Sequence, residues 1–129
     1  MPPENTELIE WPTTTLWWDE NGILYSVSKK VPQQTLEEAK ASVEMFKELT
    51  GNKKVCMIID NTNSAPTTKE IRDYAAEELE KLSKAIAIIS NSPLSRMTAN
   101  LFLGLRPPSY PVKIFKNEQD AKKWILKYL

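Results

Sequence analysis

Two hydrophobic patterns alternate along the chain, and together they predict the order of its secondary-structure elements. Short runs of apolar, aromatic or β-branched residues are typical of strands. Such runs occupy residues 14–18, 23–28, 54–60, 84–89 and 110–115. Segments in which apolar residues recur every three or four positions are typical of amphipathic helices. One such segment follows each strand after the first, at residues 35–50, 67–82, 92–105 and 117–129. The predicted order is therefore β-β-α-β-α-β-α-β-α.

The first two strands are predicted to form a hairpin. Asn21-Gly22 separates them, and this dipeptide favours a tight turn because glycine accepts a positive φ angle without strain. Residues 1–12, ahead of the hairpin, mix prolines and acidic residues without periodicity. We therefore expect a flexible N-terminal arm over residues 1–12, with Trp11 as an anchor.

The helix boundaries carry their own signals. Thr35 and Glu38 have the spacing of a capping box, in which each side chain accepts a hydrogen bond from the other's backbone N–H. Gly51 is suited to end the same helix in the left-handed conformation. Thr67 and Glu70 repeat the capping-box spacing. The remaining helices are expected to start at residues that prefer the N-cap position: Thr67 or Thr68, Ser92 and Asn117.

The predicted sheet is mostly parallel, because helices of about 12–15 residues separate the later strands and require crossover connections. Strand 54–60 has an entirely apolar centre, which favours a central strand covered on both faces. Pro111 cannot donate to a ladder, so we expect strand 110–115 at an edge. The sequence predicts one α/β domain over residues 13–129, with a mostly parallel five-stranded sheet, an N-terminal antiparallel hairpin and four helices.

Composition excludes several functions. The 129 residues carry 17 basic and 17 acidic side chains, and this balance argues against a nucleic-acid partner. Histidine is absent, which excludes a Ser-His-Asp triad and a Cys-His dyad, and leaves the single cysteine without partners for a usual zinc site. Three glycines cannot build a phosphate-binding glycine loop. We expect no enzymatic activity, no cofactor and no metal.

Other features of the sequence indicate the cellular compartment of the protein. The N-terminal residues show neither a basic leader nor an apolar segment, as a secretory signal would. The longest apolar runs, 55–59 and 85–89, have five residues, whereas a membrane span needs about 20. Cys56 lies within the first run and is expected to be a buried, inert thiol. We predict a cytoplasmic protein without a membrane span.

Polar residues follow two predicted strands at the point where each strand ends. Because carboxyl ends of parallel strands meet at one sheet edge, these residues should lie together. Hydroxyls and amides beside helix N-termini can hold an anion or accept a phosphoryl group, whereas the simpler interpretation is that they form turns and caps. The candidate residues are Asp60, Asn61, Asn63, Ser64, Thr67, Thr68, Ser90, Asn91 and Ser92.

Asp60 has several possible roles, namely phosphoacceptor, metal ligand or switch residue. A metal site would favour a second carboxylate nearby, and none occurs at residues 61–69 or 90–95. We therefore expect Asp60 to cap the following turn. Arg72 and Arg96 are candidate anion contacts, since a guanidinium suits bidentate recognition. Exposed salt bridging with Glu70 or Asp73 is the simpler interpretation and the favoured one.

Apolar residues are predicted on both faces of the sheet. Trp17 and Trp18 are adjacent in one strand and must point to opposite faces, and residues 85–89 are apolar throughout. Each face therefore needs cover. Helices and the N-terminal arm can supply it, and the alternatives are a homodimer interface or a pocket for an apolar ligand.

Four stretches, residues 21–24, 58–60, 85–96 and 111–125, share their pattern with a known family. Among them, 85–96 reads Ala-Ile-Ala-Ile-Ile-Ser-x-Ser-x-x-x-Arg. Over residues 14–129 the chain resembles the STAS superfamily, and within it the SpoIIAA-like group of small stand-alone bacterial domains. The resemblance implies a mostly parallel sheet with packed helices and no catalytic machinery.

The same resemblance implies two kinds of function. Signalling members are phosphorylated by a partner kinase after the Asp-ended strand, where this chain offers Ser64, Thr67 and Thr68 but lacks their Asp-Ser-(Ser/Thr)-Gly run. Other relatives are similar to lipid-binding domains. We therefore expect a protein-interaction module in bacterial signalling or regulation, or alternatively the binding of a small apolar or lipid-like ligand in a partly apolar pocket.

Overall fold

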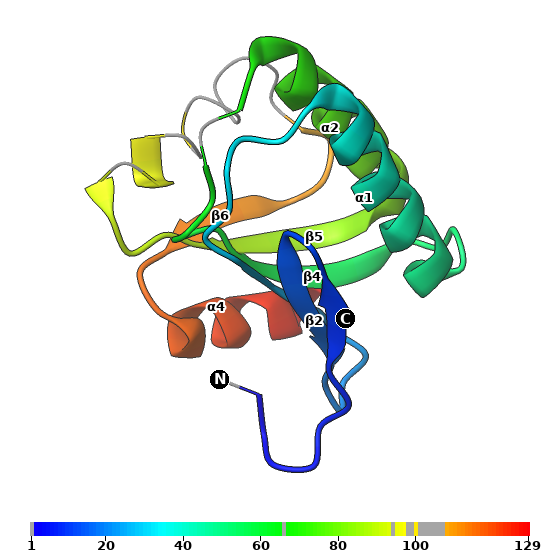
Figure 1. The fold of residues 1–129 in the computed structure, drawn as a ribbon. Coiled ribbons are helices and arrows are strands. Elements are labelled where there is room, and N and C mark those ends of the chain that lie inside the picture. The colour runs from blue at the N-terminus through cyan, green and yellow to red at the C-terminus, as the bar shows by residue number, and fades with distance from the viewer. Residues whose placement is uncertain (1, 66, 94, 98–99, 101–107) are drawn as a thin grey trace.

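The structure is a computed structural model that describes residues 2–65, 67–93, 95–97, 100 and 108–129. Its centre is a six-stranded sheet with its strands in sequence order (Figure 1). The first three strands are antiparallel neighbours, and the pairs from β3 to β6 are parallel. The strands are β1 (Ile9–Trp11), β2 (Thr14–Trp18), β3 (Leu24–Ser28), β4 (Val55–Asp60), β5 (Ser83–Ile89) and β6 (Val112–Phe115).

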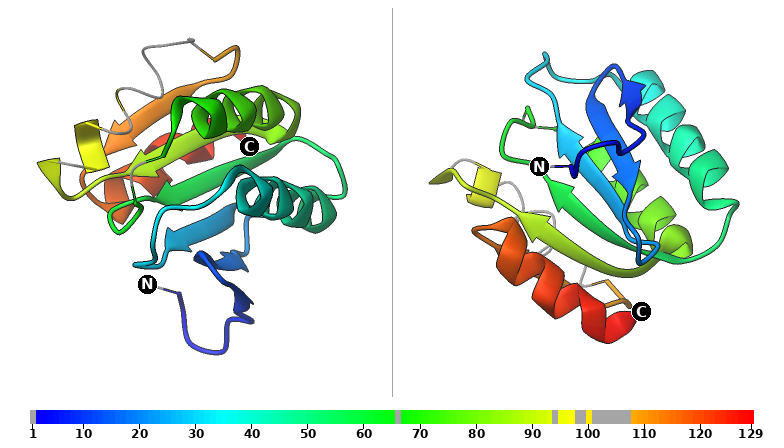
Figure 2. Two further views of the ribbon diagram at one scale, coloured as in Figure 1. Left: turned by 45° about the horizontal axis from the view of Figure 1, so that its top comes forward. Right: turned by 90° about the horizontal axis from the view of Figure 1, so that it is seen from below.

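Helices cover both faces of the sheet. Helices α1 (Leu36–Thr50) and α2 (Lys69–Leu82) lie on one face, and α4 (Glu118–Ile125) lies on the other, continued by the short 3₁₀ helix η1 (Leu126–Tyr128). Figure 2 shows the same three layers from two further directions. In the described residues no helix is both long and apolar enough to cross a bilayer.

Strand alternation divides the core into two clusters. On the α4 face, Tyr25, Ile58 and Ile89 belong to a cluster that includes Ala121 and Ile125 of α4. On the opposite face, the cluster includes Leu24, Met57 and Ile88, together with Met45 of α1 and Leu82 of α2. Residues one position apart in a strand thus contribute to different layers, as the pleat requires.

The predicted α/β fold is confirmed, with one strand more than expected. Pro111 directly precedes β6, which lies at an edge of the sheet, and β4 lies inside it, as expected. The hairpin turn contains Gly22 at φ 77°, a conformation that favours glycine.

The expectation of a flexible arm through residue 12 is wrong for residues Ile9–Trp11. These residues form β1, because they pair with β2 from Ile9 opposite Leu16 to Trp11 opposite Thr14. The Trp11 indole Nε1 donates to the Ser42 hydroxyl of α1 at 3.1 Å, so the expected anchoring role of Trp11 is confirmed.

Three of the predicted helix starts have the expected caps. Thr35 and Glu38 form the capping box of α1, and Asn117 caps α4 by accepting from the Asp120 N–H at 2.8 Å. Helix α2 begins after Thr68, whose hydroxyl accepts from the Ile71 N–H at 3.2 Å. The Thr67–Glu70 capping box is therefore wrong, because that pattern lies one residue ahead of the cap.

The predicted third helix is described only in part. The Ser92 hydroxyl accepts from the Ser95 N–H at 3.1 Å, the geometry of an N-cap, and Pro93, residues 95–97 and Asn100 are helical. Met97, one of the apolar residues that recur along this segment, is 55% exposed. Residues 94, 98–99 and 101–107, which include most of the predicted apolar face, lie outside the described residues.

Candidate functional site

The predicted polar edge lies where β4 and β5 end, and hydrogen bonds join its two loops. The Ser90 hydroxyl donates to the Asn61 side-chain oxygen at 2.5 Å, and the Asn91 N–H donates to the Thr62 hydroxyl at 3.2 Å. The Asn61 N–H also donates to the Ile89 carbonyl at 3.1 Å. The side chains of Asn61 and Ser90 therefore hold the two loops of the edge together.

Asp60 caps the turn after β4, as expected. Its Oδ1 accepts from the Thr62 N–H at 3.0 Å. Within the described residues, no three histidine, cysteine, aspartate or glutamate side chains are grouped so that they could hold a metal ion. Among the residues that the structure describes, Asp60 therefore belongs to no such group of ligands.

The three candidate phosphoacceptors differ in their surroundings. Ser64 is exposed, whereas Thr67 is half-buried. The exposed Thr68 uses its hydroxyl as the cap of α2. Asn63 beside Ser64 and Asn91 in the next loop are also exposed, while Ser92 is bonded to Ser95. The exposed residues of the predicted edge are thus Asn63, Ser64, Thr68 and Asn91, and among them the Thr68 hydroxyl is committed to its cap.

The two arginines are not brought into the cavities of this edge. Arg72 Nη1 donates to the Thr67 carbonyl at 2.6 Å and so ties the start of α2 to the loop before it. The Nε atoms of Arg72 and Arg96 are buried without a hydrogen-bond partner among the described residues. Neither arginine lines either cavity described below. The role of Arg72 and Arg96 as anion contacts therefore stays a prediction from the sequence.

The first cavity, here called the α1-side cavity, has a volume of about 250 Å³. Its walls come from the β3–α1 loop, α1, α2, the ends of β3 and β4, and the loop that carries Ser64 and Thr67. The lining is mainly apolar, whereas hydroxyls, the Gln34 amide and the charged side chains of Lys29 and Asp60 supply its polar part. The apolar lining residues are Val31, Pro32, Val43, Phe46, Ile59, Ala65 and Leu79.

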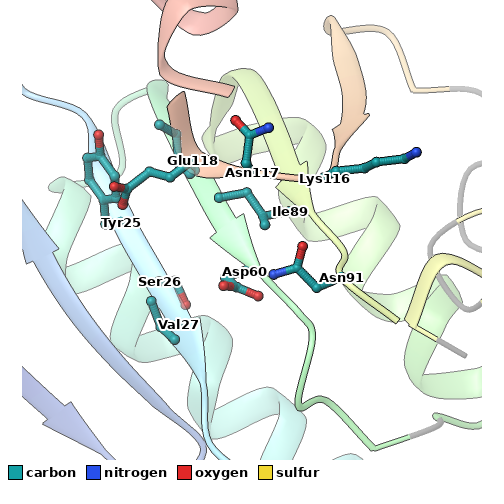
Figure 3. A pocket seen from close by; sticks show the side chains of 10 residues that line it. Tyr25, Ser26, Val27, Asp60, Ile89, Asn91, Lys116, Asn117 and Glu118 are labelled. Carbon is teal, nitrogen blue, oxygen red and sulfur yellow. The ribbon is translucent and has the colours of Figure 1, made fainter. Parts of the chain in front are cut away.

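The second cavity, here called the α4-side cavity, has a volume of about 390 Å³ and lies at the carboxyl ends of β3, β4 and β5. Apolar contacts come from Val27, Ile58 and Ile89. Figure 3 shows its polar side chains, which come from four separate segments. These are Tyr25, Ser26, Asp60, Asn91, Lys116, Asn117 and Glu118.

Tyr25 is a buried, stacked phenol in the lining of the α4-side cavity. The residue is 5% exposed, and its ring stacks on Trp17 with centroids 5.1 Å apart. Burial raises the pKa of the Tyr25 phenol far above its ordinary value, and the negative charges of Asp19, Glu118 and Glu20 raise it further. The phenol therefore stays protonated, and its surroundings carry a negative potential.

Cys56 has no part in either cavity. It is buried in β4, and its Sγ donates to the Tyr128 carbonyl at 3.6 Å. Burial raises the pKa of this thiol, although the nearby Lys84 acts in the opposite direction. Since the thiolate is the nucleophilic form, the expectation of an inert thiol is consistent with this environment.

Tyr25, Lys116 and Glu118 are not among the site residues predicted from the sequence, and neither are the apolar walls of the α1-side cavity. Side chains alternate along a strand, so the sequence of β3 does indicate that Tyr25 and Ser26 lie on opposite faces of the sheet. The missing information was the order of the strands, because only the adjacency of β3, β4 and β5 brings Tyr25 near Asp60.

These features define an α/β domain with a SpoIIAA-like fold and a candidate binding edge at the carboxyl ends of its parallel strands. The chain belongs to the family described as Domain of unknown function (DUF7793), whose model matches residues 16–129. The comparison with curated proteins gave no match.

The solved structures that match this chain include the following two. One is an uncharacterized protein from Shewanella loihica PV-4, from the DUF3478 family and with a SpoIIAA-like fold, at 17% identity and a TM-score of 0.62. The match covers 97% of this chain and 98% of that one, which confirms the expected fold. The other is a protein with unknown function from Arthrobacter sp. FB24, at 26% identity, a TM-score of 0.31 and 85% and 90% coverage.

Proposed function

We propose that this domain is a non-enzymatic binding domain that takes up a small apolar ligand in the α1-side cavity. The observation that carries the proposal is the cavity lining, in which Val43, Phe46, Ile59 and Leu79 face a space of about 250 Å³. An apolar cavity of about 150 Å³ is already large enough to bind benzene. The α1-side cavity can therefore hold a larger group, such as a short alkyl chain or a substituted ring.

The energetics favour an amphipathic ligand. Each buried methylene group contributes roughly 0.8 kcal/mol, so a few carbon atoms suffice for measurable affinity. Polar lining residues, among them Thr13, Ser28 and Gln34, can bond a hydroxyl end. A ligand with a short apolar tail and one uncharged polar end fits this lining best.

Binding without turnover is what the chemistry of the described residues supports. The lining of the α1-side cavity contains Asp60 and Lys29 as its ionisable residues. Asp60 already accepts from the Thr62 N–H, and the chain contains no histidine that could serve as a general base. Cys56 lies elsewhere, in the buried core.

The test is a two-dimensional NMR titration of the full chain with 1-octanol, paired with native mass spectrometry of the purified protein. Amide shifts are expected at Val43, Phe46 and Ala65. Ala65→Leu places a larger side chain in the cavity wall and should weaken binding about tenfold or more, since a blocked apolar site loses several methylene contacts. Ala41→Leu on the exposed surface of α1 is the matched control. Equal binding by both variants would contradict the proposal.

A second candidate function is an interaction module regulated at Ser64. The favouring observation is that Ser64 is exposed and lies in a loop fixed by the Asn61–Ser90 bond, whereas the Thr68 hydroxyl is committed to its cap. Incubation with bacterial lysate and ATP should add one phosphate, detected by intact-mass spectrometry. Ser64→Ala should abolish the addition and Ser109→Ala should not. Phosphate at another residue, or none, would eliminate this candidate.

A further inference from the structure

The hydroxyl groups in the wall of the α1-side cavity differ in whether the protein itself supplies their hydrogen-bond partners. The Thr14 hydroxyl donates to the Val27 carbonyl at 3.0 Å, and its oxygen lies 2.6 Å from the Ser26 hydroxyl oxygen. The Ser42 hydroxyl accepts from the Trp11 indole N–H at 3.1 Å. The lining hydroxyls of Thr14, Ser26 and Ser42 are therefore already engaged within the protein.

Ser28 differs from these residues. Its Oγ is buried and has no hydrogen-bond partner among the described residues. Ser28 lies opposite Thr14 in the β2–β3 register, but the Thr14 proton is used on the Val27 carbonyl. On the other side of β3, the ladder with β4 ends at Val27 opposite Asp60, one residue before Ser28. Ser28 is therefore a residue of the cavity lining whose hydroxyl the fold leaves unused.

An unused hydroxyl in a cavity wall points to a ligand group. Buried polar groups are normally hydrogen-bonded, and an unpaired one costs free energy that a bound ligand can recover. No hydrogen bond fixes the rotamer of Ser28, so a change of its χ1 angle can direct the hydroxyl to the cavity that the residue lines. Ser28 can thus give a ligand a hydrogen bond that the free protein does not make.

The neighbouring residues of the lining indicate which ligand group suits Ser28. Lys29 and Gln34 line the same cavity, and their ammonium and amide groups, like the Ser28 hydroxyl, are hydrogen-bond donors. The charge of Lys29 is paired with Glu10 at 2.7 Å, and the Asp60 carboxylate belongs to the lining, so an anionic ligand group is disfavoured. An uncharged oxygen that accepts hydrogen bonds meets these conditions best.

We propose that Ser28 determines the ligand class of the α1-side cavity by donating its hydroxyl proton to the carbonyl oxygen of an uncharged ligand, such as a ketone, an ester or an amide. The inference rests on the proposed function, since the apolar part of the ligand lies against Val43, Phe46 and Leu79 as described there. A ketone or ester carbonyl accepts hydrogen bonds and brings no proton of its own that needs an acceptor. Ser28 therefore selects among apolar molecules of similar size.

The test is a two-dimensional NMR titration of the full chain with acetophenone and with α-methylstyrene, which carries a C=CH₂ group in place of the C=O group. Saturable shifts are expected at the amides of Ser28, Val43 and Phe46. The quantity to compare is the ratio of the two dissociation constants, because the shared apolar part of the two compounds cancels in it. Ser28→Ala should shift this ratio about fivefold against acetophenone, the size expected for one hydrogen bond.

Ser42→Ala is the matched control, because it removes a lining hydroxyl that is engaged with Trp11. It should lower the midpoint of thermal unfolding and leave the ratio of dissociation constants unchanged. Ser28→Ala should change the midpoint little, since no bond within the protein is lost. An unchanged ratio in Ser28→Ala, a midpoint lowered as far as in Ser42→Ala, or tighter binding of benzoate than of acetophenone would overturn the proposal.

The outcome is separable from that for the proposed function. α-Methylstyrene has no polar group, so its binding tests the apolar cavity alone. Failure of both compounds to bind would contradict the proposed function and, with it, the role of Ser28. Binding of α-methylstyrene together with an unchanged ratio in Ser28→Ala would reject the role of Ser28 and leave the apolar site in place.

Discussion

The Ser90 hydroxyl donates to the side-chain oxygen of Asn61 at 2.5 Å, so one hydrogen bond joins the loops that follow β4 and β5. Ser90 is completely buried, and Asn61 is half-buried. Two loops that are 29 residues apart in sequence are therefore held at a fixed distance. Because Asp60 and Asn91 flank this bond and line the α4-side cavity, the bond also sets the shape of the cavity wall.

Ser90→Ala should lower the free energy of unfolding by about 1–2 kcal/mol, since the Asn61 oxygen loses a buried donor. Urea denaturation measures the change. The exposed Ser64→Ala serves as the control and should stay within about 0.5 kcal/mol of the unchanged protein. Equal stability of the two variants would show that the Asn61 oxygen is bonded to water in solution.

The position of the α2 cap gives a second prediction. Thr68→Ala should destabilise the protein by about 1 kcal/mol, because the Ile71 N–H loses its acceptor. Thr67→Ala should have a smaller effect, since its hydroxyl lies ahead of the cap. Thermal denaturation of both variants compares them directly. A larger effect at Thr67 would support the cap position that the sequence pattern predicts and contradict the structure.

Local signals explain why so much of the fold was predictable. Asn21-Gly22, the Thr35–Glu38 box and Asn117 act within a few residues of their own positions, and the structure shows each in its expected role. The Thr67–Glu70 pattern failed because a neighbouring Thr68 offers an equally good cap. The local sequence alone does not indicate which of the two threonines caps the helix. The packing of α2 determines where the helix begins.

The strand β1 and the cavities depend on long-range contacts. Ile9–Trp11 is too short to show an alternation, and it becomes a strand only because β2 offers an edge and Ser42 a hydrogen-bond acceptor. The predicted edge residues Asp60 and Asn91 do line a cavity. Tyr25 and Glu118 line the same cavity but come from opposite ends of the chain, so neither composition nor spacing indicated that they would meet there.

Trp11→Phe tests the attachment of β1. The substitution keeps an aromatic ring but removes the indole donor to Ser42, so we expect a loss of about 1 kcal/mol in unfolding free energy. Faster hydrogen exchange at the amides of β1 should accompany it. Ser42→Ala in the Trp11→Phe background should add little, because the two side chains form one interaction. Additive losses would contradict this pairing.

The pH dependence of stability tests the buried thiol in β4. Burial raises the pKa of Cys56, so in the unfolded chain the thiol loses its proton first, at about pH 8.5. Above that pH the unfolded state binds fewer protons than the folded state, and the free energy of unfolding must fall as pH rises. Below that pH the contribution is fully present. The slope for one group is at most about 1.4 kcal/mol per pH unit.

Cys56→Ala removes the titrating group and should flatten the stability curve between about pH 8.5 and 10. Beyond this window both proteins should lose stability, since burial raises the pKa of Tyr110 to about 12 and that of Tyr25 further. Urea denaturation at closely spaced pH values measures the two curves, and the comparison uses their slopes because the substitution also changes the absolute stability. Parallel slopes for the two proteins between pH 8.5 and 10 would mean that the thiol of Cys56 titrates at its ordinary pKa in the folded state.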